Sequence, residues 1–193
     1  SEYIAPLEGK ALTGNKIWDR LKPPPYSSVF PDKPPVVDGV AAAGEWDHTP
    51  SLDLQHGKLH FQNDAANLYL LVDTTADTHA DPPLVSEPWG DHFWLSFDVN
   101  LDSAVTSNVD LNYALYPGTH TFGVQEYLGP GQWTGLFDTF SRLGAGFGAS
   151  FNEATPHRIW EIAISLSEIE AAPNELVRLG LRTYSQEPSF SDD

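Results

Sequence analysis

The sequence predicts an all-β fold: an antiparallel β-sandwich of the immunoglobulin-like or jelly-roll type, with one short helix and a Pro-rich N-terminal arm. Two observations carry this prediction. From residue 38 onward, short runs alternate apolar and polar residues, as half-buried strands require. Brief Gly-, Asp- and Pro-containing segments separate these runs, and such segments favour tight connections between neighbouring antiparallel strands.

Residues 1–37 differ in texture from the domain predicted over 38–193. Prolines are dense from Pro23 to Pro35, and because proline lacks an N–H this segment cannot form a central strand. A short helix is expected before them, around 12–21. Two interpretations stay open. The segment is a linker, or it is an arm that packs its apolar side chains on the domain, namely Ile17, Trp18, Leu21, Tyr26 and Phe30.

The clearest strand is expected over 91–99, where Phe93, Leu95 and Phe97 alternate with outward-facing polar and aromatic residues. Ser167, followed by early acidic residues, has the pattern of a helix N-terminus and predicts the one short helix of the domain. The other strands are expected over 52–55, 58–63, 67–73, 109–116, 119–127, 132–137, 147–152, 157–165 and 177–185.

Composition excludes several classes of protein. The chain of 193 residues has a formal net charge of −17, which repels phosphate backbones and argues against nucleic-acid binding. It has no cysteine, so disulfides and thiolate chemistry are excluded. No apolar run reaches the length of a membrane span, and we expect any leader peptide to have been removed. No nucleophile elbow, phosphate-binding loop or catalytic triad spacing occurs, so we predict a protein without enzymatic activity.

Five segments, in the same order, resemble the carbohydrate-binding modules of the family 9-like type, which belong to the DOMON-like group of β-sandwiches. The resemblance spans about residues 38–187. The segments are VVDGVAAAGEWDHT, LHFQNDAANLYLLVDTT, PWGDHFWLSFDVN, HRIWEIAISLSEI and VRLGLRTYSQ. The resemblance implies a secreted or cell-surface binding module with structural calcium. Its expected partners are a poly- or oligosaccharide and other domains of a larger parent protein.

Aromatic residues are the expected sugar-binding groups, because flat C–H faces of sugars stack on rings while their hydroxyls pair with polar side chains. Trp94 meets this description best, since it shares a strand face with His92. Trp46 and Trp160 are expected in the core. The further candidates for the binding surface are His92, Trp89, Tyr113, Tyr116 and Trp133.

The sharpest metal-binding pattern is Asp98, Asn100 and Asp102, whose oxygen-bearing side chains are two residues apart. Such spacing lets side chains converge on one calcium ion, which takes 6–8 oxygen ligands. Ser103 stands where an EF-hand needs glycine, so we expect a looser calcium loop that Asp110 closes. The alternative is that these residues only form turns.

Two other acidic groups are weaker candidates. Asp73, Asp77 and Asp81 are expected in a solvated loop around His79. Asp38 or Glu45 is expected to tie the first loop to the body, through a metal or a buried hydrogen bond.

Two alternatives to sugar binding follow from the same residues. One is a calcium-stabilised structural or adhesive domain of a cell-surface assembly, with no sugar ligand. The other is a haem-binding DOMON-like domain. Methionine, a frequent axial ligand of haem, is absent, so only a histidine-based variant of that alternative is open.

Overall fold

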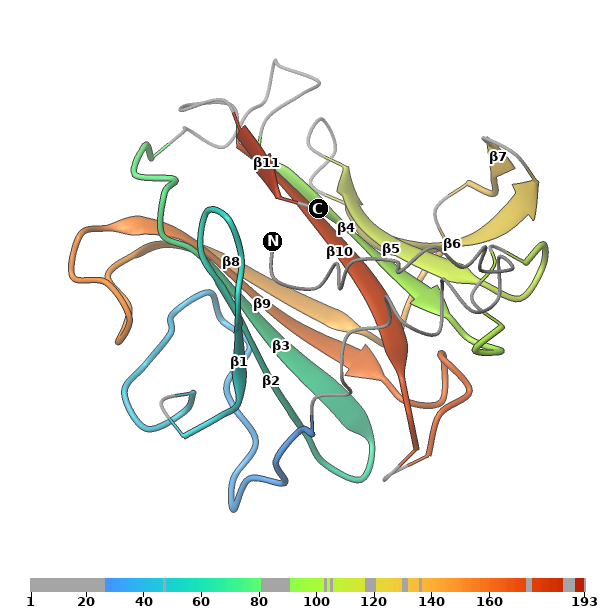
Figure 1. Cartoon of the computed structure of the whole chain (residues 1–193), viewed down its shortest axis with the longest axis horizontal. Helices are drawn as coiled ribbons and strands as arrows, with labels where there is room; N and C mark the ends of the chain where they lie inside the picture. Colours follow the sequence, from blue (N-terminus) through green and yellow to red (C-terminus); the bar gives the residue numbers. More distant parts are fainter. Residues whose placement is uncertain are drawn as a thin grey trace, which may run out of the picture.

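The computed structural model describes residues 27–46, 48–80, 91–102, 104, 106–116, 121–129, 132–135, 137–172, 175–185 and 190–192 (Figure 1). Within these residues the chain forms strands β1 to β11 and no helix. All pairings between these strands are antiparallel. The expected all-β, antiparallel architecture is confirmed. The predicted arm lies largely outside the described residues, as does the helix around 12–21.

The first sheet has five strands in the order β1-β2-β3-β9-β8. Its centre is the long ladder between β3 and β9, which runs from Asn67 opposite Ser165 to Thr74 opposite Arg158. The bounds of β2 and β9 agree with the prediction. The five strands are β1 (Ser51–Asp53), β2 (Lys58–Asn63), β3 (Asn67–Thr74), β8 (Arg142–Gly148) and β9 (His157–Ser165).

The second sheet has six strands in the order β11-β10-β4-β5-β6-β7. The sequence-local hairpins β4–β5 and β5–β6 lie side by side, and β10 returns from the end of the chain to pair with β4. The six strands are β4 (His92–Asp98), β5 (Leu111–Tyr116), β6 (Thr121–Gly129), β7 (Gln132–Trp133), β10 (Arg178–Ser185) and β11 (Phe190–Asp192).

One hydrophobic core joins the two sheets, as in a sandwich. Alternation directs Leu70 and Val72 of β3 and Phe93 and Leu95 of β4 into this core, where all four are fully buried. Trp160 of β9 contacts Phe93 edge to face, with ring centroids 5.4 Å apart. Its predicted place in the core is confirmed.

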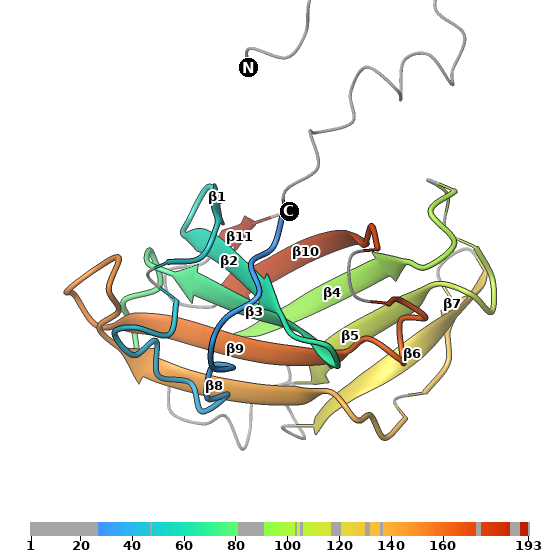
Figure 2. The same cartoon turned by 90° about the horizontal axis from the view of Figure 1, so that it is seen from below.

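The outer face of the five-stranded sheet is also covered. Residues 36–50 fold over it, and in Figure 2 this segment, in blue, crosses β9 and β8. Trp46 is fully buried there against Tyr69, Leu71 and Ile159, so its predicted burial is confirmed. This sheet therefore has apolar side chains on both faces.

A buried carboxylate holds the first loop in place. Glu161 of β9 accepts the indole N–H of Trp46 at 2.7 Å and the backbone N–H groups of Asp38 at 2.9 Å and Gly39 at 2.8 Å. Burial raises the pKa of Glu161. The expected buried hydrogen bond exists, but the carboxylate comes from the body. The side chains of Asp38 and Glu45 instead accept N–H groups of their own loop.

Glycines of β8 allow the first loop to come this close. A Cβ on Gly144 would lie 2.5 Å from the backbone nitrogen of Gly39, and one on Gly146 would lie 2.0 Å from the carbonyl oxygen of Gly39. Gly144 is paired with Glu161, so the N–H groups of the loop reach the carboxylate across a strand that has no side chain at Gly144 or Gly146. Because these glycines interrupt the alternation of apolar and polar residues in β8, the sequence did not predict this strand at its true position and placed a strand at 147–152 instead.

The helix expected at Ser167 is absent from the structure. Residues 166–170 form consecutive turns. Glu170 has a φ of 51°, a left-handed backbone conformation that cannot continue a right-handed helix. The carboxylate of Glu168 bonds the backbone N–H of Phe140 at 2.7 Å instead of serving a helix N-terminus. Tertiary contacts therefore override the local helix signal.

Replacing Gly144 by alanine should lower the free energy of unfolding by about 1–3 kcal/mol, the usual cost of overpacking, because the new Cβ would collide with the backbone of the first loop. Gly148→Ala is the matched control in the same strand, since a Cβ there meets nothing within 4 Å. Urea unfolding of the two variants checks this. Equal stability of the two would contradict the close packing of the loop on β8.

Candidate functional site

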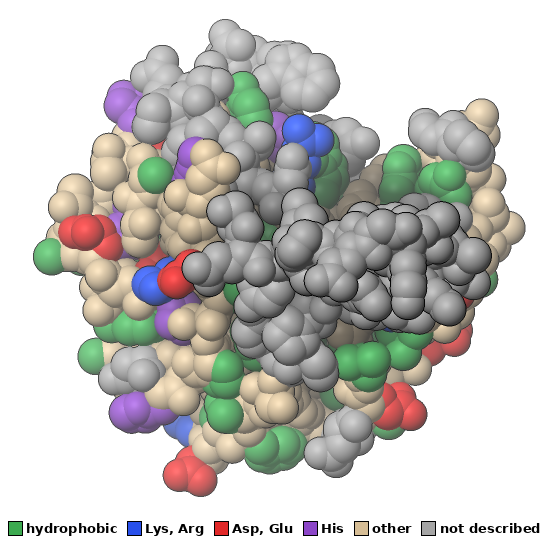
Figure 3. Space-filling view, viewed as in Figure 1, with side chains coloured by type: hydrophobic (Ala, Val, Ile, Leu, Met, Phe, Trp, Pro, Cys, Tyr) green, Lys and Arg blue, Asp and Glu red, His purple; other side chains and the backbone are tan. Residues whose placement is uncertain are grey.

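The strongest predicted binding residue, Trp94, lies on the outer face of the six-stranded sheet. It pairs with Ala114 of β5 and Arg182 of β10, and its side chain is half-buried. The guanidinium of Arg182 lies 5.8 Å from the centroid of the indole ring, a cation–π contact. Figure 3 shows basic and hydrophobic side chains next to each other near the start of β4 and the end of β10. The predicted polar-face position of Trp94 is confirmed.

His92 supports Trp94 rather than lying free beside it. Its ring stacks on Tyr184 with centroids 4.9 Å apart and meets Trp94 edge to face at 4.6 Å. His92 is only 4% exposed, so it cannot offer a broad surface to a ligand. Together, these three rings form one aromatic group, which we call the first aromatic group.

A row of hydrogen-bonded polar side chains crosses the same face one step along the strands. The hydroxyl of Ser96 donates to the Asn112 amide oxygen at 3.1 Å, and the Asn112 amide donates to the Gln125 oxygen at 3.3 Å. Gln125 then donates to the backbone oxygen of Thr134 at 2.9 Å. The register of β4, β5 and β6 places these three side chains opposite one another. We call this arrangement the polar row.

A second aromatic group stands on the far side of the polar row. Tyr127 of β6 pairs with Trp133 of β7, and their rings meet edge to face with centroids 5.1 Å apart. Both side chains are half-buried. Trp133 therefore lies on the same sheet as Trp94, separated from it by β5 and β6.

One further predicted ring, that of Tyr113, does not join this surface. Tyr113 is fully buried in the core, which overturns its role as a surface ring. The physical reason is parity: Asn112 and Ala114 face outward, so the residue between them faces inward. Its hydroxyl donates to Glu168 at 3.1 Å. Trp89 and the side chain of Tyr116 lie outside the described residues.

The structure brings the four predicted calcium ligands into one loop after β4. Asp102 accepts the Ala104 N–H at 2.7 Å and the Thr106 hydroxyl at 2.8 Å, and these hydrogen bonds lower its pKa. Asn100 donates to Asp102 at 3.0 Å, and the carboxylate of Asp110 accepts the Val99 N–H at 3.1 Å.

Asp98 of this loop already has a positively charged partner, because the guanidinium of Arg178 bonds its carboxylate at 2.5 Å. The side chains of this loop offer the oxygen ligands that calcium prefers. To bind the ion, however, the carboxylate of Asp98 would have to release Arg178. Among the residues that the structure describes, no group of three His, Asp or Glu side chains is arranged to hold a metal. Calcium at this loop stays a prediction.

Sequence reasoning missed a buried polar network around Asp73. The carboxylate accepts hydrogen bonds from Asn152 at 2.6 Å and Ser150 at 2.8 Å, and it pairs with the ring of His157. Asp73 and His157 are both fully buried, so the expected solvated position of Asp73 is wrong. The only sequence signal was an Asp that ends one apolar strand and a His that begins another.

The protonation of this pair follows from its partners. His157 Nδ1 lies 2.7 Å from the carbonyl oxygen of Thr155, so that nitrogen must donate. Hydrogen bonding to Asp73 raises the pKa of His157, despite the opposing effect of burial, and lowers the pKa of Asp73. The pair is therefore an imidazolium and a carboxylate. Because neither side chain is exposed, it stabilises the fold and cannot contact a substrate directly.

A second buried charge cluster lies between the sheets. Arg158 bonds Asp91 through Nε at 3.0 Å and Nη2 at 2.9 Å, and its Nε lies 4.0 Å from Asp77. Asp77 is 1% exposed, which contradicts its expected place in a solvated loop. Burial, and secondly the charge of Asp91, raise the pKa of Asp77 to about 7. Asp81 lies outside the described residues.

These shifts predict maximal stability in mildly acidic solution. Asp77 keeps its proton in the folded state up to a pKa of about 7, against 3.8 as the ordinary value, so the free energy of unfolding should fall as pH rises between those values. The contribution of His157 is complete below its ordinary pKa of 6.5 and is lost as pH rises through its raised folded value.

Asp77→Asn should remove the fall in the free energy of unfolding that Asp77 causes below pH 7, because asparagine has no proton to release. Asp138→Asn, at an exposed position, is the control and should retain this fall. Urea unfolding from pH 4 to pH 8 measures both. A wild-type stability that is constant over this range would show that Asp77 is ionised throughout.

Comparisons with known proteins add no relative to this description. No family model matches the chain, and no curated protein matches it. The structure contains no helix long and apolar enough to span a membrane among its described residues. The case for function therefore rests on the geometry of the outer face of the six-stranded sheet.

Proposed function

We propose that this chain is a non-catalytic, secreted or cell-surface binding domain that takes an oligo- or polysaccharide on the outer face of the six-stranded sheet. The observation that carries the proposal is the polar row between two aromatic groups. The resemblance to family 9-like modules of the DOMON-like group supports the same function. The fold of two antiparallel sheets is consistent with the β-sandwich that this resemblance implies.

The chemistry of this face suits a sugar chain. Rings such as Trp94 and Trp133 offer apolar faces for C–H groups. In the polar row, Ser96 is the half-buried member whose hydroxyl can contact a sugar. Asn112 and Gln125 are only 5% and 7% exposed, so they hold the surface in place from below. The polar row is hydrogen-bonded internally and ends on the backbone of Thr134, so its groups are held in place before a ligand arrives. Such preorganisation lowers the entropy cost of binding.

The dimensions favour an extended ligand. Trp133 lies three strand spacings from Trp94, about 14 Å across the sheet. A single sugar cannot reach both rings, so an oligosaccharide of several units is the expected ligand. The net charge of −17 favours neutral rather than anionic glycans, since like charges repel.

The two alternatives make different demands on the same molecule. A purely structural or adhesive domain would keep its stability but bind no glycan. A haem-binding domain needs a free imidazole nitrogen, whereas His60 and His157 use both ring nitrogens in hydrogen bonds or close polar contacts. Purified protein without a Soret absorption band would remove the haem alternative.

Trp94→Ala should weaken glycan binding by at least about 30-fold, because loss of a central aromatic anchor costs about 2 kcal/mol or more. Phe140→Ala is the matched control, since Phe140 is an exposed aromatic at 85% in the loop between β7 and β8. Affinity electrophoresis against soluble glucans, xylans and mannans measures both. If wild-type protein bound none of these, or if the two variants bound equally well, the proposed site would be refuted.

Structural calcium is part of the proposal and has its own test. Calcium at about 100 times its dissociation constant should add about 2.7 kcal/mol to the free energy of unfolding, and a chelator should lower the melting temperature. Asp102→Asn should weaken the response, because it removes one anionic oxygen ligand from the loop. A melting temperature that ignores both calcium and chelator would remove calcium while leaving the glycan site intact.

A further inference from the structure

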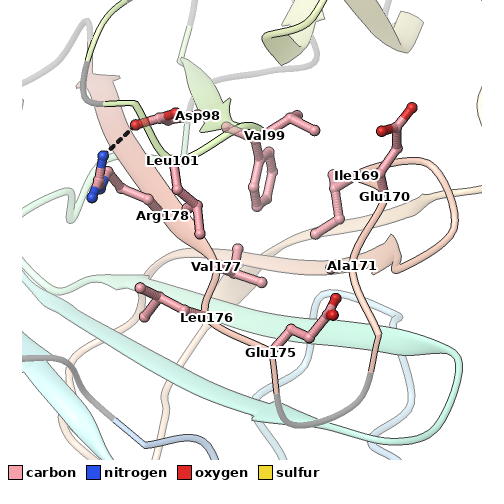
Figure 4. Close-up of a pocket in the computed structure, with 11 residues that line it drawn as sticks. Asp98, Val99, Leu101, Ile169, Glu170, Ala171, Glu175, Leu176, Val177 and Arg178 are labelled. Atoms are coloured by element: carbon pink, nitrogen blue, oxygen red, sulfur yellow. Dashed lines mark hydrogen bonds and ion pairs between the residues drawn. The ribbon is translucent and has the colours of Figure 1, made fainter.

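A second candidate site lies at the other end of β4, away from Trp94. It is a pocket of about 340 Å³ between the loop that follows β4 and the loop that precedes β10 (Figure 4). Its apolar lining includes Val99, Leu101, Ile169 and Val177. Leu176, also at the pocket, is 57% exposed. The pocket therefore offers apolar surface that is partly open to solvent.

The charged residues of the pocket are mostly acidic. Asp98, Glu170 and Glu175 line it together with one base, Arg178, which pairs with Asp98. In Figure 4 the carboxylate of Glu170 points away from the apolar centre, whereas that of Glu175 is directed toward Ala171 and accepts the N–H of Ala172 at 2.6 Å. The pocket suits an apolar group accompanied by positive charge.

Backbone strain marks the same place. Leu101 has a φ of 59° and Glu170 a φ of 51°, and both residues line the pocket. A left-handed conformation is costly for a bulky residue such as leucine, and such strain persists where the surroundings enforce it, often at binding sites.

The chain itself contains a segment of the required chemistry. Residues 16–22 read Lys-Ile-Trp-Asp-Arg-Leu-Lys, which combines three bases with one acid and three large apolar side chains. The remainder of the chain from residue 34 onward is strongly acidic. Electrostatic attraction between this segment and the pocket is therefore expected.

The arm enters the domain close to this pocket. Asn63, at the end of β2, donates its N–H to Val29 at 3.0 Å, and Ala66 in the following turn accepts the N–H of Leu166 at 2.8 Å. Leu166 leads into the loop that lines the pocket. The β2–β3 turn and the start of β10 lie at the same lower end of the molecule in Figure 1. An extended, Pro-rich connection from Leu21 to Ser27 could span about 19 Å.

We propose that this pocket is the docking site of the chain's own N-terminal arm, with Trp18 in the apolar centre and the basic residues of 16–22 against Glu170 and Glu175. The docked arm would bury Leu176 and neutralise part of the acidic rim. This inference is independent of glycan binding, because the pocket and the polar row involve different residues.

Disulfide trapping in the full chain tests the proposal, since the natural sequence has no cysteine. Asp19→Cys is combined with Leu176→Cys in one variant. The matched control combines Asp19→Cys with Ala65→Cys, an exposed position beside the point where the arm enters. Docking should make the pocket pair form an intramolecular disulfide at least about tenfold faster than the control, through its higher effective concentration.

Adding Trp18→Ala to the pocket pair should reduce its rate to that of the control, because the apolar anchor is lost. Two results would overturn the proposal. One is equal rates for the pocket and control pairs, which indicates an arm that does not dock. The other is a disulfide formed between two chains only, which would assign the pocket to the arm of a second copy.

Discussion

The carboxylate of Glu161 is the contact that holds the first loop on the outer face of the five-stranded sheet. It accepts three N–H groups from the first loop, and it does so across a strand that lacks side chains at Gly144 and Gly146. The loop thereby buries Trp46 and covers the outer face of the five-stranded sheet. The inner faces of both sheets form the common core. The remaining face, the outer side of the six-stranded sheet, carries half-buried aromatic side chains beside the polar row, in which Ser96 is half-buried and Asn112 and Gln125 are buried.

Parity along the strands then decides which side chains form the candidate site. Alternate residues of β4 and β5 face the core, so Trp94, Ser96 and Asn112 share the outer face while Tyr113 lies inside. The antiparallel register places Gln125 next in line. The polar row and the two aromatic groups are consequences of this register, whereas the pocket near Arg178 depends on loops at the end of the sandwich.

Strand positions were predictable where alternation was strong. Period-two patterns predicted the bounds of β2 and β9 and the outward position of Trp94. The predicted position of β8 was wrong, because its glycines do not contribute to such a pattern. The Asp73–His157 pair could not be predicted, since its partners are 84 residues apart in sequence and meet only when β3 pairs with β9. The polar row also needs the register between strands, and a single sequence does not specify that register.

The most direct test of glycan binding at this face is the behaviour of the tryptophan indole N–H resonances in two-dimensional NMR. The chain has six tryptophans, and substitution of each one assigns its signal. Titration with neutral oligosaccharides should shift the signals of Trp94 and Trp133, while those of the buried Trp46 and Trp160 stay in place. Binding that leaves Trp94 and Trp133 unshifted, or the absence of any shift across glucan, xylan and mannan oligosaccharides, would contradict the account.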